Sequence, residues 1–237
     1  MTSLENARVL VIGGSSGIGL ATARAAAAAG AEVVIASRSA KKLEAAKQDM
    51  GVNVTTAVLD ITDAEALEAW FGAAASFDHI VVSAAQTPTG PVRKLALDDA
   101  RKAVDSKFWG AYQVARAARF SERGTLTLVS GFLSERPSAS SVLQGAINAA
   151  LEALARGLAL ELSPVRVNTV SPGLIDTPLW NGLGDDGRTA MFDKVSKSLP
   201  AKTVGKPEHI ANAVLFLMTT PFATGSNVRV DGGGAIG

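Results

Sequence analysis

Short runs of β-branched and other apolar residues alternate with longer segments of helical periodicity along almost the whole chain. Such alternation is typical of βαβ units on a parallel sheet. We predict strands at Arg8–Ile12, Glu32–Ala36, Val54–Leu59, His79–Ser83, Thr125–Val129, Arg166–Val170 and Asn227–Val230. The predicted helical segments are Ile18–Ala29, Ala40–Met50, Ala64–Ala74, Leu97–Arg119, Leu143–Glu161 and Glu208–Met218.

The pattern predicts one α/β domain over residues 1–237, a doubly wound seven-stranded parallel sheet flanked by helices. No stretch has the composition of an interdomain linker, and this length is common for one parallel α/β domain. Thr177–Thr203 breaks the alternation, because it is rich in Gly, Asp and Lys and is bounded by Pro178 and Pro200. Long insertions of this kind are often functional, so we expect a lid there.

Composition excludes several classes of partner. The 23 Lys and Arg nearly balance the 22 Asp and Glu, so nucleic acid is not expected. Without cysteine, and with only His79 and His209 far apart, the chain offers no thiolate nucleophile and no expected metal site. The segment Met1–Arg8 is unlike a signal peptide, and no apolar run is long enough for a membrane span. We expect a cytoplasmic protein with a small-molecule substrate.

The segment Leu143–Glu161 is rich in Ala and Leu around most of its circumference. One face of a sheet cannot cover such a helix. We therefore expect a homodimer or homotetramer built on this helix and on Leu97–Arg119. The alternative is a helix buried within a monomer.

A glycine-rich turn joins the first predicted strand to the first predicted helix. Glycines let a pyrophosphate approach the backbone, and the N–H groups and positive end of the helix stabilise the anion. The strand and helix on either side make this turn more specific than a glycine pattern alone. The residues expected at the phosphates are Gly13, Ser15, Ser16, Gly17, Ile18 and Gly19.

The end of the second strand predicts which dinucleotide binds. A protein selective for NAD usually has an acidic residue here for the ribose 2′-hydroxyl, and this chain has Ser37 and Arg38. A guanidinium at Arg38 suits a 2′-phosphate, so we predict NADP(H). A solvated arginine at the end of a strand is the alternative.

With these motifs, the chain resembles the short-chain dehydrogenase/reductase family, whose members have a single-domain Rossmann fold. The resemblance covers nearly the whole chain, including Arg166-Val167-Asn168 and the terminal Val230-Asp231-Gly232-Gly233. It implies that Asp60 and Ile61, after Leu59, contact the adenine, and that a segment similar to the family's Asn-Asn-Ala-Gly lies against the cofactor. The positions expected there and at the nicotinamide end are Ser83, Ala84, Ala85, Pro172, Gly173, Ile175 and Thr177.

The catalytic positions of this chain depart from the family's pattern. Family members that reduce carbonyls use a Tyr, a Lys four residues later, a Ser, and an Asn on the preceding long helix. Alignment places Gln144 at the Tyr, Asn148 at the Lys and Lys107 at the Asn; Gly131, preceded by Ser130, is at the Ser. Amides cannot exchange protons near neutral pH. The only tyrosine, Tyr112, is on the wrong helix to replace the family's Tyr.

Two interpretations remain. In the first, the protein is an NADP(H)-dependent oxidoreductase with a non-standard site: Lys107 supplies the charge or proton, Ser130 and Gln144 orient the oxygen, and Asn148 completes the set. In the second, it is a catalytically silent nucleotide-binding sensor, scaffold or assembly partner. The retained nicotinamide-side residues Pro172, Gly173 and Thr177 favour the enzyme. The alternative to a catalytic role is that Lys107 is an ordinary lysine exposed to solvent on its helix.

Overall fold

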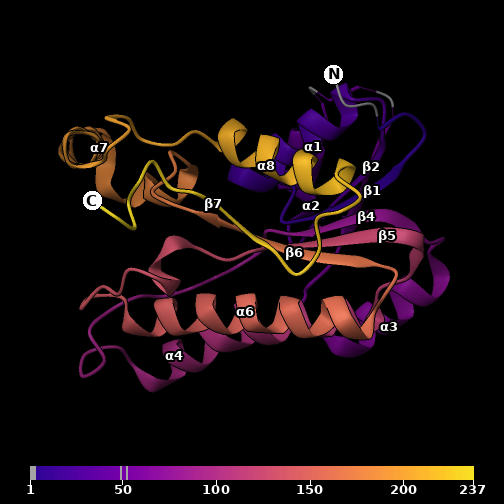
Figure 1. Cartoon of the computed structure of the whole chain (residues 1–237), viewed down its shortest axis with the longest axis horizontal. Helices are drawn as coiled ribbons and strands as arrows, with labels where there is room; N and C mark the ends of the chain where they lie inside the picture. The colour runs from indigo at the N-terminus through magenta and orange to yellow at the C-terminus, as the bar shows by residue number, and fades with distance from the viewer. Residues whose placement is uncertain (1–3, 49, 52) are drawn as a thin grey trace.

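The computed structural model describes residues 4–48, 50–51 and 53–237. A parallel seven-stranded sheet in the order β3-β2-β1-β4-β5-β6-β7 lies between two layers of helices (Figure 1). The order reverses between β1 and β4, which is the doubly wound arrangement predicted from the sequence. The strands are β1 (Arg8–Ile12), β2 (Glu32–Ser37), β3 (Val54–Val58), β4 (Phe77–Val82), β5 (Phe120–Val129), β6 (Arg166–Pro172) and β7 (Asn227–Val230).

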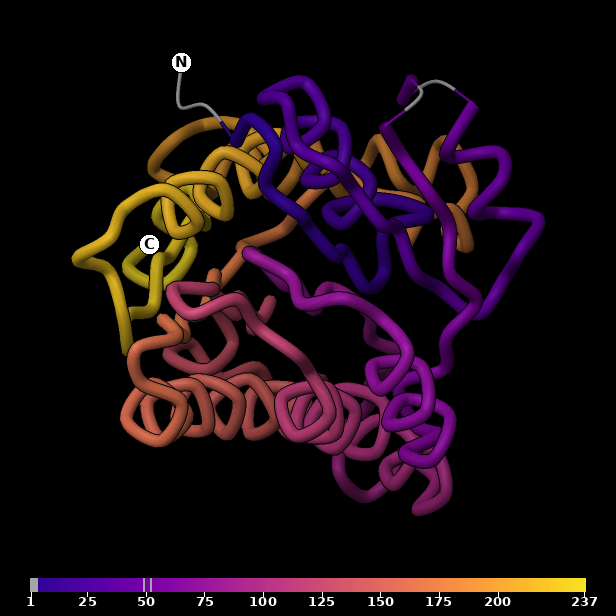
Figure 2. The backbone as a smooth tube through the Cα atoms, turned by 90° about the vertical axis from the view of Figure 1, so that its right-hand side faces the viewer, coloured from indigo at the N-terminus to yellow at the C-terminus, as the bar shows by residue number. Residues whose placement is uncertain are grey.

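Helices cover both faces of the sheet. One layer contains α1 (Gly17–Ala28), α2 (Ala40–Lys47) and α8 (Pro207–Thr219). The other contains α3 (Ala64–Ala73), α4 (Leu97–Val104), α5 (Gly110–Ala117) and α6 (Val142–Glu161). Figure 2 shows the two layers on opposite sides of the sheet, with α1 and α8 above it and α6 below.

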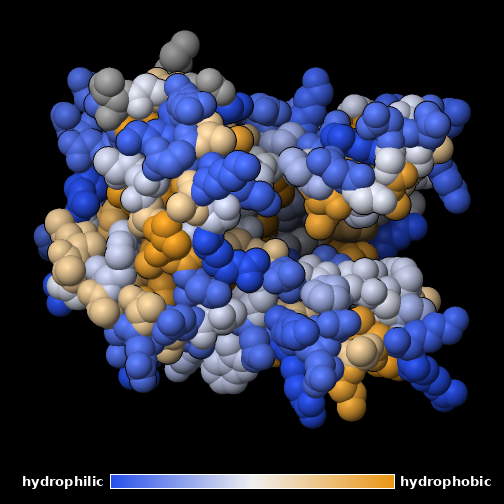
Figure 3. All heavy atoms as spheres, turned by 180° about the vertical axis from the view of Figure 1, so that it is seen from behind, coloured by the Kyte–Doolittle hydropathy of each residue, from blue (hydrophilic) through white to orange (hydrophobic). Residues whose placement is uncertain are grey.

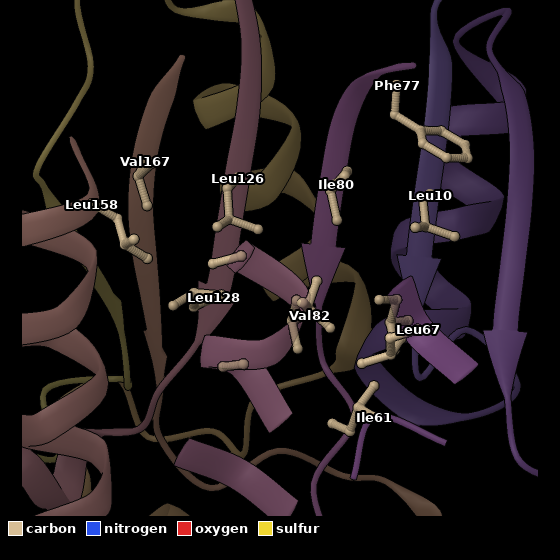
Figure 4. Packing of buried hydrophobic residues seen from close by; sticks show 14 of the residues in the cluster. Leu10, Ile61, Leu67, Phe77, Ile80, Val82, Leu126, Leu128, Leu158 and Val167 are labelled. Atoms are coloured by element: carbon tan, nitrogen blue, oxygen red, sulfur yellow. The ribbon is translucent and has the colours of Figure 1, made fainter. Parts of the chain in front are cut away.

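The core is double because successive residues of each strand point to opposite faces. In β1, Leu10 and Ile12 pack into the cluster under α3, α5 and α6, whereas Val9 and Val11 pack toward α1 and α8. Figure 4 shows the first cluster, in which Leu10, Ile80 and Leu126 extend from neighbouring strands toward the same helices. Fully apolar strands are expected when a parallel sheet is covered on both sides.

All the predicted strands are present, but two predicted segments differ from the structure. The segment Leu97–Arg119 is not one α-helix, since the π-helical turn η1 (Asp105–Trp109) separates α4 from α5. The insertion Thr177–Thr203 is largely helical, with the 3₁₀-helix η3 (Pro178–Leu183) followed by α7 (Gly184–Ser198). Two glycines and three aspartates within α7 weaken its helical signal in the sequence.

Some sequence expectations fall partly outside the description. The segment Met1–Arg8 includes residues 1–3, and the predicted helix Ala40–Met50 includes residue 49; these lie outside the described residues. In the described part of the chain, no helix is long and apolar enough to cross a bilayer.

Candidate active site

The glycine-rich turn between β1 and α1 brings three segments together. A Cβ atom at Gly13, where φ is +89°, would lie 2.6 Å from the backbone nitrogen of Ala84 after β4. A Cβ atom at Gly17 would lie 3.3 Å from the Thr177 methyl carbon after β6. Only glycine, which has no Cβ atom, allows the backbone at position 13 to adopt this conformation so close to Ala84. The turn therefore lies at the carboxyl ends of the strands, where the sheet order reverses and open α/β sheets bind ligands.

A cleft of about 670 Å³ opens at this turn. Figure 3 shows the surface hollowed between the two helical layers on the side of the molecule where α7 lies. The cleft is large enough to enclose an extended nucleotide, since ligand pockets typically occupy about 300–1,000 Å³. Its lining includes most of the predicted cofactor residues: Gly13, Ser15, Ser16, Gly17, Ile18, Ser37, Arg38, Asp60, Ile61, Ser83, Ala84, Ala85 and Thr177.

Four other predicted cofactor residues are not among the described residues that line the cleft. Gly19 packs against the Gly13 carbonyl, so its role in this structure is to let α1 approach the turn. Pro172 ends β6, and a Cβ atom at Gly173 would lie 2.6 Å from the Asp231 Cα atom. Ile175 is buried in the core on the α1 and α8 side.

The cleft also contains side chains that the sequence analysis missed. The lining includes Ile12, Lys42, Leu59, Thr62, Gln86, Lys102, Asp105, Ser106, Pro178 and Leu179. Lys42 was predictable in principle, because it lies in the first turn of the helix that begins directly after Arg38 and Ser39. Gln86 and Ser106 were not, since their proximity depends on a tertiary hydrogen bond of 2.8 Å from the Gln86 amide to the Ser106 hydroxyl.

Arg38 and Asp60 lie at one end of the cleft. The Arg38 side chain is exposed, and its Nη2 atom donates to Gln86 Oε1 over 3.3 Å. Burial raises the pKa of Asp60, but hydrogen bonds from the Thr62 amide and hydroxyl, together with the Arg38 guanidinium, bring it below its ordinary value. This end of the cleft therefore presents a fixed carboxylate beside an accessible guanidinium.

Lys107 is buried within η1, contrary to the interpretation of a solvated helix lysine. Only 8% of the residue is exposed. Its Nζ atom donates to the Ser130 carbonyl over 2.7 Å and to Asn148 Oδ1 over 2.6 Å. Burial lowers the pKa of Lys107 to about 8, against an opposing effect of Glu152. Lys107 lies in the π-helical turn η1, a kind of turn often found at functional sites, and it follows the buried Ala103 by four residues.

Asn148 is held on both sides of its amide. Its Oδ1 atom accepts from Lys107, and its Nδ2 atom donates to the Gly131 carbonyl over 3.1 Å. A Cβ atom at Gly131 would lie 2.7 Å from Nδ2. Gly131 therefore makes room for this amide, which explains in packing terms why a residue with a side chain does not occupy that position.

The structure brings Ser130 to Lys107, whereas no hydrogen bond joins Gln144 to Lys107 among the described residues. The Ser130 hydroxyl donates to Glu152 Oε1 over 2.9 Å and approaches the Val170 carbonyl at 3.3 Å, so it points into the protein. Gln144 is half-buried on α6, one turn before Asn148. None of Lys107, Ser130, Gln144 and Asn148 is among the described residues that line the cleft. Hydrogen bonds join Lys107, Ser130 and Asn148 into a group, and Lys107 directly follows two residues that do line the cleft, Asp105 and Ser106.

Glu152 is a polar residue of this group that the sequence analysis missed. It is 9% exposed and accepts hydrogen bonds from the Ser130 and Ser134 hydroxyls. Its position four residues after Asn148 placed it on the same face of α6, and an acid on a buried helix face was the available signal. Among the ranges that the structure describes, no group of His, Asp and Glu could hold a metal ion.

Comparison with known proteins assigns the family. A family model described as enoyl-(acyl carrier protein) reductase matches residues 13–234. A short-chain dehydrogenase/reductase of Acremonium sp is 31% identical, over 98% of this chain and 97% of the relative. The chain belongs to the short-chain dehydrogenase/reductase family. Short-chain dehydrogenases/reductases are oxidoreductases, and the observed single Rossmann-type domain is the one that the resemblance implied.

Two solved structures of this family are similar over nearly their whole length. A small-chain dehydrogenase in complex with NADPH has a TM-score of 0.81 and 34% identity, covering 98% of this chain and 100% of its own. An NADPH-bound short-chain oxidoreductase from Pseudomonas aeruginosa PAO1, described as containing an atypical catalytic center, has a TM-score of 0.89 and 27% identity. Coverage in that pair is 96% of each chain.

Proposed function

We propose that this short-chain dehydrogenase/reductase transfers hydride between NADP(H) and a small carbonyl substrate, with Lys107 as its acid and base. One observation carries the proposal: a buried Lys107 ammonium hydrogen-bonded to Asn148. Compared with the family's pattern, the lysine and the asparagine have exchanged helices. The ammonium and the amide still contact each other, as a retained active site requires.

The cofactor assignment is supported by the cleft. Glycines of the β1–α1 turn expose backbone at its floor, and Arg38 provides a guanidinium for a 2′-phosphate. Relatives of the same fold bind NADPH, which is consistent with this choice. NADPH, when bound, supplies the hydride. Asp60, with its lowered pKa, suits a hydrogen-bond donor on the adenine.

The proton is assigned to Lys107 for reasons of charge and geometry. An ammonium has three N–H donors, and two of those of Lys107 bond to Ser130 and Asn148. The third N–H has no hydrogen-bond partner among the described residues, and we assign it to the oxygen of a carbonyl substrate that enters from the cleft beside Lys107. With a pKa of about 8, the group is protonated at neutral pH and yields its proton more readily than an exposed lysine. A positive charge there also stabilises negative charge developing on that oxygen.

The insertion after β6 is assigned as a lid over the cleft. Thr177, Pro178 and Leu179, at its start, line the cleft. The following helix α7 has no buried residue, so little apolar packing holds it to the body of the protein. An element with few buried contacts opens at low free-energy cost.

Binding and turnover test the function separately. Calorimetry should give tighter binding of NADPH than of NADH. NADPH absorbance is then followed with a panel of aldehydes, ketones and imines; oxidation that depends on a panel member supports the enzyme. Tight NADPH binding without turnover of any panel member would instead support the silent sensor or scaffold.

A further inference from the structure

The Glu152 carboxylate is buried and is linked to the proposed proton donor, Lys107, through Ser130. It accepts from the Ser130 hydroxyl over 2.9 Å and from the Ser134 hydroxyl over 2.7 Å. The Ser130 carbonyl in turn accepts from Lys107 Nζ over 2.7 Å. One residue, Ser130, thus connects the cation to the anion through its two polar groups. The hydroxyls anchor the carboxylate on the Lys107 side of α6.

Glu152 is the only buried charged group on the elements that pack against η1, as far as the structure describes them. On α4, Asp98, Arg101 and Lys102 are exposed and Asp99 is half-exposed. Within η1 and on α5, Asp105 and Arg116 are exposed. Further along α6, Arg156 and Glu161 are exposed. Water screens exposed charges strongly, whereas it screens buried ones little. Glu152 therefore dominates the charge that Lys107 experiences.

We infer that Glu152 is a positioning residue that keeps Lys107 protonated at neutral pH and so sets the pH range of the proposed proton transfer. The effect of Glu152 on the pH range of catalysis rests on the proposed function, whereas its effect on the protonation of Lys107 does not. Burial alone would favour the neutral amine. An anion in the same low-dielectric region favours the ammonium, and the direction of the effect of Glu152 on the pKa of Lys107 agrees.

The test compares Glu152→Gln with the parent by a readout that needs no substrate. Lysines are labelled with ¹³C at Cε, the Lys107 signal is assigned by its loss in Lys107→Met, and its chemical shift is followed against pH. The Lys107 pKa should fall by about one unit in Glu152→Gln, the size typical of removing a nearby opposite charge. Glu152→Asp, which restores the charge, should recover most of that shift. Glu161→Gln, an exposed acid on the same helix, is the matched control and should leave the pKa unchanged.

Glu152→Met serves if Glu152→Gln fails to fold. It removes the charge with a side chain of similar length, and the two hydroxyls keep nearby acceptors in the Val170 and Gly131 carbonyls, at 3.3 Å and 3.1 Å. An unchanged Lys107 pKa in a folded charge-free variant would overturn the inference. If that pKa moves while Lys107→Met keeps full turnover, the inference holds and the catalytic proposal fails. If Lys107→Met abolishes turnover but the Lys107 pKa is unchanged in the charge-free Glu152 variants, the catalytic proposal holds and the inference about Glu152 fails.

With a substrate, the same variants separate charge from structure. Rates of carbonyl reduction should decline above the Lys107 pKa, and this decline should move to lower pH in Glu152→Gln. A purely structural Glu152 would lower the rate equally at every pH, which would contradict the inference.

Discussion

Lys107 Nζ donates to Asn148 Oδ1 over 2.6 Å, which joins a buried cation in η1 to an amide on α6. An ammonium in such a place opposes folding, because it leaves water for an environment that stabilises its charge less well. Two hydrogen bonds and the Glu152 carboxylate reduce that opposition. Residues that destabilise the fold in this way are typical of sites where function requires them.

The first prediction concerns stability at alkaline pH. The folded pKa of Lys107, about 8, is below its ordinary value of 10.5, so between these values the unfolded chain binds more protons than the folded one. The free energy of unfolding of the parent should therefore rise relative to Lys107→Met as pH increases from about 8 to 10.5, by up to about 3 kcal/mol. Urea unfolding at several pH values measures it, with the exposed Lys41→Met as control. A difference independent of pH would contradict the buried, charged Lys107.

Arg38 should determine the preference for NADPH. Charge-assisted hydrogen bonds contribute about 1.5–3 kcal/mol, so Arg38→Ala should weaken NADPH binding by roughly 10- to 150-fold and leave NADH binding nearly unchanged. Calorimetry with both cofactors measures the change. Lys41→Ala, which removes a neighbouring cation outside the cleft lining, is the control. Equal loss for both cofactors, or none for either, would show that Arg38 does not bind the 2′-phosphate.

Gly131 should be intolerant of any side chain. The Cβ atom of Gly131→Ala would lie 2.7 Å from Asn148 Nδ2 and force the amide to move, so we expect a loss of about 1–3 kcal/mol in unfolding free energy. Adding Asn148→Ala should recover part of this loss, which a double-mutant cycle measures. Gly72→Ala, at an open position of α3, should be neutral or stabilising. Simple additivity of the two substitutions would contradict the packing explanation.

The outer face of α6 should mediate self-association into a dimer or tetramer. Leu160 is 84% exposed there, and exposed small side chains at Ala146, Ala149 and Ala153 continue the same face of the helix and permit close helix packing. Light scattering at micromolar concentration should show more than one chain per particle, and Ala153→Glu should reduce that number. Gly72→Glu on α3 should not. A monomeric parent would contradict the prediction.

The fold was predictable because its signals are local. Strand and helix periodicity, with glycine between β1 and α1, specified the sheet and the position of the cleft. The burial of Lys107 was partly predictable, because Ala103, Lys107 and Ala111 are spaced four apart and share one face of a helix. The partners of its ammonium, Ser130 and Asn148, were not predictable, since only the tertiary structure brings them to it. Glu152 was missed for a related reason. Its significance depends on the hydroxyls of Ser130 and Ser134, which only the tertiary structure brings to it.

The most direct test of the proposed function is the rate at which Lys107→Met oxidises NADPH with a carbonyl that the parent reduces. We expect kcat/KM to fall by about 10²- to 10⁴-fold, the contribution typical of general acid catalysis, while calorimetric NADPH affinity stays nearly unchanged. The parental rate should itself decline above pH of about 8, as the ammonium loses its proton. A Lys107→Met protein that oxidises NADPH at the parental rate, with the same pH dependence, would contradict the assignment of the proton to Lys107.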